Sequence, residues 1–248
     1  MKKKIFLITS NRSEYGILRN FIKDCKQSKK IQLNIIATGS HLNKFFGYTA
    51  NEILKDNNKI FKKIKIDNLN NKFKNPYEQS AKIISRFSHL FKKNKPDLVL
   101  VLGDRYEIFS SVVAAVFNNV PIAHIQGGEI TEGSMDEIFR HSITKMSNYH
   151  FVATKKSKKR VIQLGENPRN VFFVGSLGAE NIKRIKLFSR FELKEKFKIK
   201  FATKNIMFSY HPERDNKDIS KNLNYIFSSL KSLKNTNIFL SIPNSDEG

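Results

Sequence analysis

Fold class can be inferred first from Asp97-Leu98-Val99-Leu100-Val101-Leu102-Gly103-Asp104-Arg105-Tyr106-Glu107, in which an apolar strand gives way to charged residues. The apolar run is continuous rather than alternating, which is typical of a parallel strand buried on both faces of a sheet. Asp104 and Arg105 follow the strand directly, and a helix-like stretch comes after them. In open α/β sheets ligands bind outside the carboxyl ends of the strands, so this junction is also a candidate site.

Short β-rich segments alternate with helical patterns along the first part of the chain, which is typical of βαβ units and a parallel sheet. We expect strands at residues 5–9, 33–37, 60–66, 98–102, 122–125, 150–153 and 171–174. We expect helices at residues 15–26, 77–92, 107–117, 136–146 and 156–164. Together these elements predict a complete Rossmann-like α/β domain over residues 1–178.

The pattern changes after Gly175-Ser176-Leu177-Gly178. A charged helical stretch is expected over residues 179–198, followed by a strand at 205–210, a helix at 218–233 and a strand at 238–241. Two strands and one helix are too few to form a sheet covered on both faces. We therefore expect residues 179–248 to be the first part of a second Rossmann-like domain, truncated at its carboxyl end.

Charge raises the question of a nucleic-acid partner, because the formal net charge is +23. The lysines are scattered over expected helix ends and turns, and the chain lacks the aromatic and basic platform typical of RNA-binding domains. We interpret the lysines as solvated surface and expect no nucleic-acid partner. A basic nucleic-acid binder is the weaker alternative, and it rests on charge alone.

Cysteine and hydropathy patterns exclude several other classes. Cys25 is the single cysteine, which excludes an internal disulfide and a cysteine-rich metal site. The histidines and carboxylates lack the spacing of zinc motifs, so no metal is expected. The N-terminal apolar run is too short for a signal peptide, and no segment approaches the ~18 apolar residues of a membrane helix. We expect a soluble, cytoplasmic protein without a membrane partner.

The first expected strand ends in Thr9-Ser10-Asn11-Arg12-Ser13-Glu14-Tyr15-Gly16 and leads into a helix. A cation beside a helix N-terminus favours anion binding, because free N–H groups and the helix dipole both attract negative charge. The stretch is not GxGxxG, so no dinucleotide cofactor, and no other cofactor, is expected. The alternative is a capped helix with an exposed arginine. Thr38-Gly39-Ser40-His41 ends the second strand in the same way.

Carboxylates follow the next strands, at Asp104, Glu129 and Asp136. Acid–base catalysis needs groups whose pKa values can be shifted by burial and by nearby charge. Nearby basic side chains could supply that charge: Arg105, Arg140 and His141. The alternative is that Asp104 and Asp136 cap the helices that follow them, a common role for aspartate. Because several strand ends agree, we predict one catalytic site.

The sequence motifs at these strand ends, taken together, resemble those of the hydrolysing UDP-N-acetylglucosamine 2-epimerases of sialic-acid-type sugar synthesis. The matching motifs cover almost the whole chain: Asn11-Arg12-Ser13-Glu14-Tyr15-Gly16, Gly39-Ser40-His41, Gly103-Asp104-Arg105-Tyr106-Glu107, Gly127-Gly128-Glu129, Asp136-Glu137, Arg140-His141-Ser142-Ile143-Thr144-Lys145-Met146-Ser147, Gln163-Leu164-Gly165-Glu166-Asn167-Pro168, His211-Pro212 and Pro243-Asn244-Ser245-Asp246.

The resemblance implies a glycosyltransferase-B-like fold, in which two Rossmann-like domains face a cleft that holds a nucleotide sugar. It implies conversion of UDP-N-acetylglucosamine and water to N-acetylmannosamine and UDP, through elimination to a 2-acetamidoglucal and hydration. It implies catalytic roles for Asp104 and Asp136 and suggests a homo-oligomer. The UDP contacts implied by position are Arg12, Gly16, Arg105, His211 and Asn244.

The chain departs from the family pattern at two points. Some members carry a catalytic glutamate where this chain has Gln126, which cannot act as a base, and Glu129 is the nearest substitute. Family members also continue well beyond the length of this chain. Two alternatives therefore stay open: the same chemistry on a UDP-2,4-diacetamido-trideoxy sugar of the legionaminic type, and a non-catalytic, truncated fragment.

Overall fold

The computed structural model describes residues 1–66, 75–210 and 218–241. The chain forms two compact units, Met1–Arg184 and Ile185–Gly248. The domain boundary expected at residue 178 falls inside helix α7 (Leu177–Arg184). That helix packs against helix α1 (Arg12–Gln27), so its contacts lie with the first unit.

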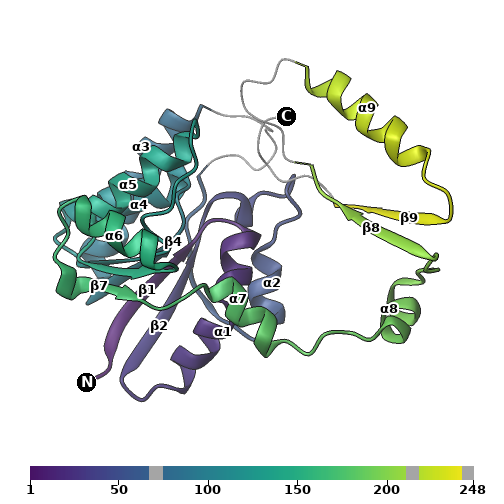
Figure 1. Ribbon diagram of the computed structural model, residues 1–248. Helices are drawn as coiled ribbons and strands as arrows, with labels where there is room; N and C mark the ends of the chain where they lie inside the picture. Colours follow the sequence, from purple (N-terminus) through teal and green to yellow (C-terminus); the bar gives the residue numbers. More distant parts are fainter. Residues whose placement is uncertain (67–74, 211–217, 242–248) are drawn as a thin grey trace. The chain divides into compact units, whose positions relative to one another are not determined.

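A parallel sheet of seven strands, in the order β3-β2-β1-β4-β5-β6-β7, forms the first unit (Figure 1). The strands are β1 (Lys3–Thr9), β2 (Ile31–Ala37), β3 (Ile60–Lys63), β4 (Leu98–Leu102), β5 (Ile122–Ile125), β6 (Tyr149–Val152) and β7 (Val171–Phe173). Chain order reverses between β1 and β4, which pair from Ile5 with Leu98 to Ile8 with Val101. This is the topological switch point, outside which doubly wound sheets bind ligands.

Helices cover both faces of this sheet, because successive side chains of its central strands point to opposite faces. Phe6 and Ile8 of β1 pack with α3 (Pro76–Asn94), α4 (Tyr106–Phe117) and α5 (Met135–Met146). Leu7, between them, packs on the other face with α1 and α2 (Ala50–Lys55). Helix α6 (Lys155–Gln163) covers β6 and β7 through Val161. Figure 1 shows α3, α4 and α5 together on one face.

The prediction of one continuous helix over residues 179–198 is wrong. The structure divides it into α7 and α8 (Arg190–Phe197). Ser189 caps α8: its hydroxyl accepts from Glu192 N at 3.2 Å, and the Glu192 carboxylate accepts from Ser189 N at 2.7 Å. This capping box fixes a new helix start and therefore ends any continuous helix. Helix α2 was not expected from the sequence.

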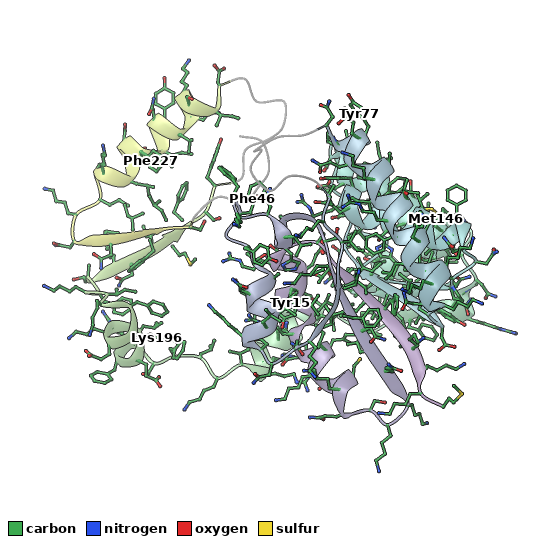
Figure 2. The ribbon with its side chains drawn as sticks, turned by 180° about the vertical axis from the view of Figure 1, so that it is seen from behind. Tyr15, Phe46, Tyr77, Met146, Lys196 and Phe227 are labelled. Atoms are coloured by element: carbon green, nitrogen blue, oxygen red, sulfur yellow. The ribbon has the colours of Figure 1, made fainter. Side chains whose placement is uncertain are left out.

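The second unit contains β8 (Lys204–Phe208), α9 (Ile219–Lys231) and β9 (Thr236–Leu240). The two strands pair in parallel, from Lys204 with Thr236 to Phe208 with Leu240. Phe227 of α9 lies over the strands, with its ring 6.5 Å from that of Phe208 (Figure 2). In the described part of this unit no apolar side chain is fully buried. Across all the described residues, no helix is both long enough and apolar enough to cross a membrane.

Candidate active site

The turn after β1 forms a helix N-terminus at the switch point. Asn11 caps helix α1, because its side-chain oxygen accepts from Glu14 N at 2.9 Å. Arg12, the first residue of the helix, is exposed beside the free N–H groups of the first turn. A cation and a helix N-terminus at one strand end make an environment that favours an anion.

Two of the predicted UDP contacts, Arg12 and Gly16, line one open pocket of about 390 Å³. Gly16 lies inside helix α1, where glycine costs roughly 1 kcal/mol relative to alanine. A Cβ built on Gly16 would meet no atom within 4 Å, so packing inside the protein does not require a glycine here. The missing side chain instead leaves the pocket open, which lets a ligand approach the helix backbone closely.

Asn181 of α7 forms hydrogen bonds to the backbone of this part of helix α1. Its side-chain nitrogen donates to Gly16 O at 2.9 Å and to Ile17 O at 2.8 Å. Its side-chain oxygen accepts from Asn20 Nδ2 at 2.7 Å. Asn181 is buried and also lines the pocket, so α7 fixes the helical turn that carries Gly16. Asn181 was not predicted as a site residue, because an isolated asparagine in a charged helix forms no recognisable motif.

Arg140 of α5 connects the turns that carry two of the predicted catalytic acids. Its Nε donates to Asp104 Oδ2 at 2.9 Å, and its Nη2 also donates to that oxygen. Its Nη1 donates to the backbone oxygen of Glu129 at 3.0 Å, and Nη2 donates to Thr131 Oγ1 at 3.1 Å. The Arg140 side chain is 7% exposed and that of Asp104 is 25% exposed, so the carboxylate is held from inside yet reachable from solvent.

The alternative that Asp104 and Asp136 are helix caps is wrong. The N-cap residue of α4 is Arg105, one position after Asp104, and it makes no side-chain capping bond. The N-cap residue of α5 is Ser134, whose hydroxyl accepts from Asp136 N at 3.2 Å. Asp136 instead lies in the first turn of α5, where the helix dipole stabilises a carboxylate. The fold therefore gives neither carboxylate a capping role.

His124 of β5 contacts the turn after β4 and helix α5 as a neutral side chain. Its Nε2 lies 3.0 Å from Gly103 O, and because a carbonyl can only accept, that nitrogen carries the proton. Its Nδ1 lies 3.2 Å from Thr144 Oγ1, and the Thr144 hydroxyl donates to Arg140 O at 2.9 Å. Burial lowers the pKa of His124 to about 4, which keeps the ring neutral at ordinary pH. This histidine therefore positions the backbone just before Asp104.

Gln126 follows β5 with a φ of 63°, a left-handed conformation that non-glycine residues rarely adopt. The next residue, Gly127, has no room for a side chain: a Cβ there would lie 2.8 Å from Thr144 Oγ1 and 2.9 Å from His124 Nδ1. Strained backbone of this kind is often found at functional sites. An amide does not titrate, so the acid–base groups of this turn are the carboxylates.

Two buried carboxyl groups that were not predicted as site residues lie near the switch point. Glu14 Oε2 accepts from Ser10 N at 2.6 Å and Oε1 accepts from Ser10 Oγ at 2.7 Å. Burial raises the pKa of Glu14 to about 7. Glu107 is also buried, and its Oε2 accepts from Arg105 Nε at 3.2 Å. The Asn-x-x-Glu spacing from Asn11 is a known helix-start signal, but it does not reveal burial.

The predicted site residues that the structure describes lie in the turns, or in the first two turns of the helices, that follow the carboxyl ends of the strands: Arg12, Gly16, Asp104, Arg105, Glu129 and Asp136. Arg12 and Gly16 share one pocket, and Arg140 ties Asp104 to the backbone of Glu129. The remaining two predicted contacts, His211 and Asn244, lie outside the described residues.

The chain is similar in sequence to several known proteins. A family model described as UDP-N-acetylglucosamine 2-epimerase matches residues 23–248. The chain is 39% identical to the polysialic acid biosynthesis protein P7 of Escherichia coli, over 99% of this chain and 63% of that protein. It is 37% identical to the GDP/UDP-N,N'-diacetylbacillosamine 2-epimerase (hydrolyzing) of Campylobacter jejuni, over 99% of this chain and 64% of that protein. The chain thus spans a little under two thirds of the length of both relatives.

A solved structure shares the fold. The crystal structure of UDP-GlcNAc 2-epimerase from Neisseria meningitidis, bound to UDP-GlcNAc, matches with a TM-score of 0.76 at 19% identity. The match covers 96% of this chain and 72% of that chain. Together with the parallel sheet of seven strands, it confirms the predicted glycosyltransferase-B-like α/β fold class.

Proposed function

The chain belongs to the UDP-N-acetylglucosamine 2-epimerase family, as its motifs predicted, and on that premise we propose that it acts on a UDP-linked 2-acetamido sugar. The proposed reaction is a hydrolysing 2-epimerisation. A base removes the proton on C2 while the bond from C1 to the UDP oxygen breaks, which gives UDP and a 2-acetamidoglucal. Water then adds its hydroxyl to C1 and a proton to C2 on the opposite face, which inverts C2.

The observation that supports this proposal is that the Arg140 guanidinium donates hydrogen bonds both to Asp104 and to the backbone oxygen of Glu129 at the switch point. Proton removal and proton return need carboxylates fixed in place and accessible, and Asp104 is both. Asp104, Glu129 and Asp136 are the proposed proton-handling groups.

The leaving group requires positive charge and free N–H groups, because a diphosphate departs as an anion. Arg12 and the N–H groups at the start of α1 offer both, and Gly16 leaves the adjoining pocket open; we assign Arg12, Gly16 and Arg105 to UDP contact. His211 and Asn244 are proposed as further UDP contacts on the strength of the family motifs. The UDP-sugar is the proposed partner, and a homo-oligomer is proposed from the family alone.

The identity of the sugar has two candidates. One is UDP-N-acetylglucosamine, with N-acetylmannosamine as product; the other is a UDP-2,4-diacetamido-trideoxy sugar, which undergoes the same chemistry. The second is favoured by the 37% identity to a diacetylbacillosamine 2-epimerase. Both substrates share C1, C2 and the UDP group, so the site residues named above serve either one.

The test is to incubate the chain in D₂O with each UDP-sugar in separate reactions and to follow the products by NMR. Return of a solvent proton to C2 predicts free UDP and a 2-epimeric sugar that carries deuterium at C2. UDP release with retained C2 configuration and no deuterium would show simple glycoside hydrolysis and would contradict the proposal. Calorimetry with UDP separates the remaining alternative: binding without turnover of either sugar would mark the chain as a non-catalytic UDP binder.

A further inference from the structure

The segment between β5 and α5 carries Glu129, one of the proposed proton-handling groups. The first part of this segment lies against α6: a Cβ on Gly128 would stand 2.6 Å from a backbone oxygen of that helix, and Arg160 donates from Nη1 to Gly128 O. The last residue of the segment, Ser134, caps α5. Between these two ends, residues 130–133 are exposed to solvent, so the position of Glu129 depends on how this exposed part is held.

Thr131, in the middle of the exposed part, forms a hydrogen bond through each of its polar groups. Its backbone N–H donates to Glu137 Oε2 at 2.6 Å, and its hydroxyl oxygen accepts from Arg140 Nη2 at 3.1 Å. Its carbonyl oxygen accepts from Ser134 N at 3.1 Å. Exposed loop residues are usually mobile. Thr131 is instead held by two side chains of α5 that are three residues apart and therefore lie on one face of that helix.

The contact of Glu137 differs from that of a capping glutamate. Glu137 is the third residue of α5, where the carboxylate of a capping box accepts from the backbone nitrogen of the capping residue, here Ser134. Ser134 N donates to Thr131 O instead, and the Glu137 carboxylate reaches back to Thr131 N. The other carboxylate oxygen, Oε1, lies 3.7 Å from Nε2 of His141, one turn further along α5. The carboxylate therefore holds the preceding segment rather than the end of the helix.

Thr131 connects Glu137 to the arginine that holds the candidate site. The same Arg140 guanidinium that donates to Thr131 also donates to Asp104 and to the backbone oxygen of Glu129. Removing the Glu137 carboxylate would leave the Arg140–Asp104 ion pair in place but would release the backbone of Thr131. The segment that carries Glu129 would then be held less firmly relative to Asp104.

We propose that Glu137 is a positioning residue, which accepts from Thr131 N–H and so fixes Glu129 beside the Arg140–Asp104 ion pair. It acts through the segment and exchanges no proton with the sugar. The inference rests on the proposed function where that function assigns proton handling to Glu129. The described residues assigned to UDP contact lie on other turns, so the loss of Glu137 should slow turnover without weakening UDP binding.

The structural test measures hydrogen exchange of the Thr131 amide, assigned through Thr131→Ser in a sample labelled with ¹⁵N-threonine. Glu137→Ala should speed this exchange by about tenfold or more, because a hydrogen bond to a charged acceptor is lost. Glu137→Gln keeps the length and an acceptor oxygen and should retain most of the protection, whereas Glu137→Asp is one carbon shorter and should lose it. Glu132→Gln, at an exposed carboxylate of the same segment, is the matched control and should change nothing.

Two results of this experiment would overturn the contact. One is unchanged Thr131 exchange in Glu137→Ala, and the other is full protection in Glu137→Asp, which would show that the reach of the glutamate is not needed. If Glu137→Ala does not fold, the comparison of Glu137→Gln with Glu137→Asp decides in the same way.

The functional test compares kcat for the UDP-sugar with the affinity for UDP. In Glu137→Ala kcat should fall by about 10–100-fold, as misplacement of a reacting group does, with the affinity for UDP unchanged. Glu137→Gln should stay close to the wild type. A loss of kcat in Glu137→Gln as large as in Glu137→Ala, with Thr131 still protected, would mean that the carboxylate itself takes part in the chemistry and would overturn the positioning role. Parallel losses of kcat and UDP affinity would also overturn it.

The two proposals fail in distinguishable ways. Absence of turnover by the wild-type chain with either UDP-sugar, together with the expected exchange of Thr131 in the variants, counts against the proposed function and supports Glu137 as the residue that fixes the segment. Normal turnover in both the wild type and Glu137→Ala counts against the role of Glu137 alone.

Discussion

Asp104 and Arg140 lie 36 residues apart in the sequence and form one ion pair, in which Arg140 Nε donates to Asp104 Oδ2 at 2.9 Å. The same guanidinium holds the backbone oxygen of Glu129 at 3.0 Å. One arginine of helix α5 therefore fixes the turns after β4 and β5 relative to each other.

Asp104→Asn should reduce UDP release by about 10²–10⁴-fold, because general acid–base groups typically contribute that much and an amide cannot take up the proton. The free energy of unfolding should fall by about 1–2 kcal/mol, since the asparagine oxygen still accepts from Arg140 but without a charge. Initial rates and urea unfolding measure the two effects separately. Unchanged turnover would contradict a proton-handling role for Asp104, whatever happens to stability.

Arg140→Lys should impair both stability and turnover, although the charge is kept. A lysine is a point charge and cannot reproduce the planar fork that reaches Asp104, Glu129 and Thr131. We expect a loss of about 2–3 kcal/mol in unfolding free energy and at least a tenfold fall in rate. Arg169→Lys, an exposed position on the same unit, is the matched control and should change neither quantity. Equal changes in unfolding free energy and rate in the two variants would show that the planar guanidinium of Arg140 is not needed.

Gly16→Ala should separate stability from binding. Alanine is a better helix former, and its Cβ would meet no atom within 4 Å, so the unfolding free energy should rise by roughly 0.5–1 kcal/mol. The same methyl group enters the pocket shared with Arg12, so the affinity for UDP should fall. Lys23→Ala, at an exposed position on the same helix, should raise stability slightly without a change in affinity. Calorimetry with UDP and thermal unfolding test both statements.

His124 should make the protein less stable in acid. Its pKa is about 4 in the folded chain and near 6.5 in an ordinary setting, so between these values the unfolded chain binds more protons. The stabilisation is therefore complete above about pH 6.5 and is lost as pH falls toward 4. His124→Gln, which keeps a donor for Gly103 O, should reduce the loss of unfolding free energy between pH 7 and pH 5 by about 2 kcal/mol. His41 should account for part of the loss that remains, because burial also lowers its pKa to about 4.

Strands buried on both faces were predicted most accurately from the sequence, because a continuous apolar run depends little on its neighbours. The strands Leu98–Leu102 and Ile122–Ile125 have the ends expected for them. Helix boundaries in exposed segments were predicted less accurately, because each boundary depends on a single capping residue. The helix expected over residues 179–198 is divided because α7 ends at Arg184 and Ser189 caps the start of α8, and the short helix α2 was missed for lack of a long periodic pattern.

The sequence by itself determined the class of fold, the family and the strand ends where charged residues gather, because these follow from local pattern and from motifs contiguous in the chain. Only the tertiary structure decided which side chains meet. It paired Asp104 with Arg140 rather than with a helix end, placed Asn181 against Gly16, and buried Glu14 and Glu107. The physical reason is that hydrogen bonding, burial and the pKa shifts they cause depend on neighbours brought from distant parts of the chain, and the order of parallel strands fixes those neighbours.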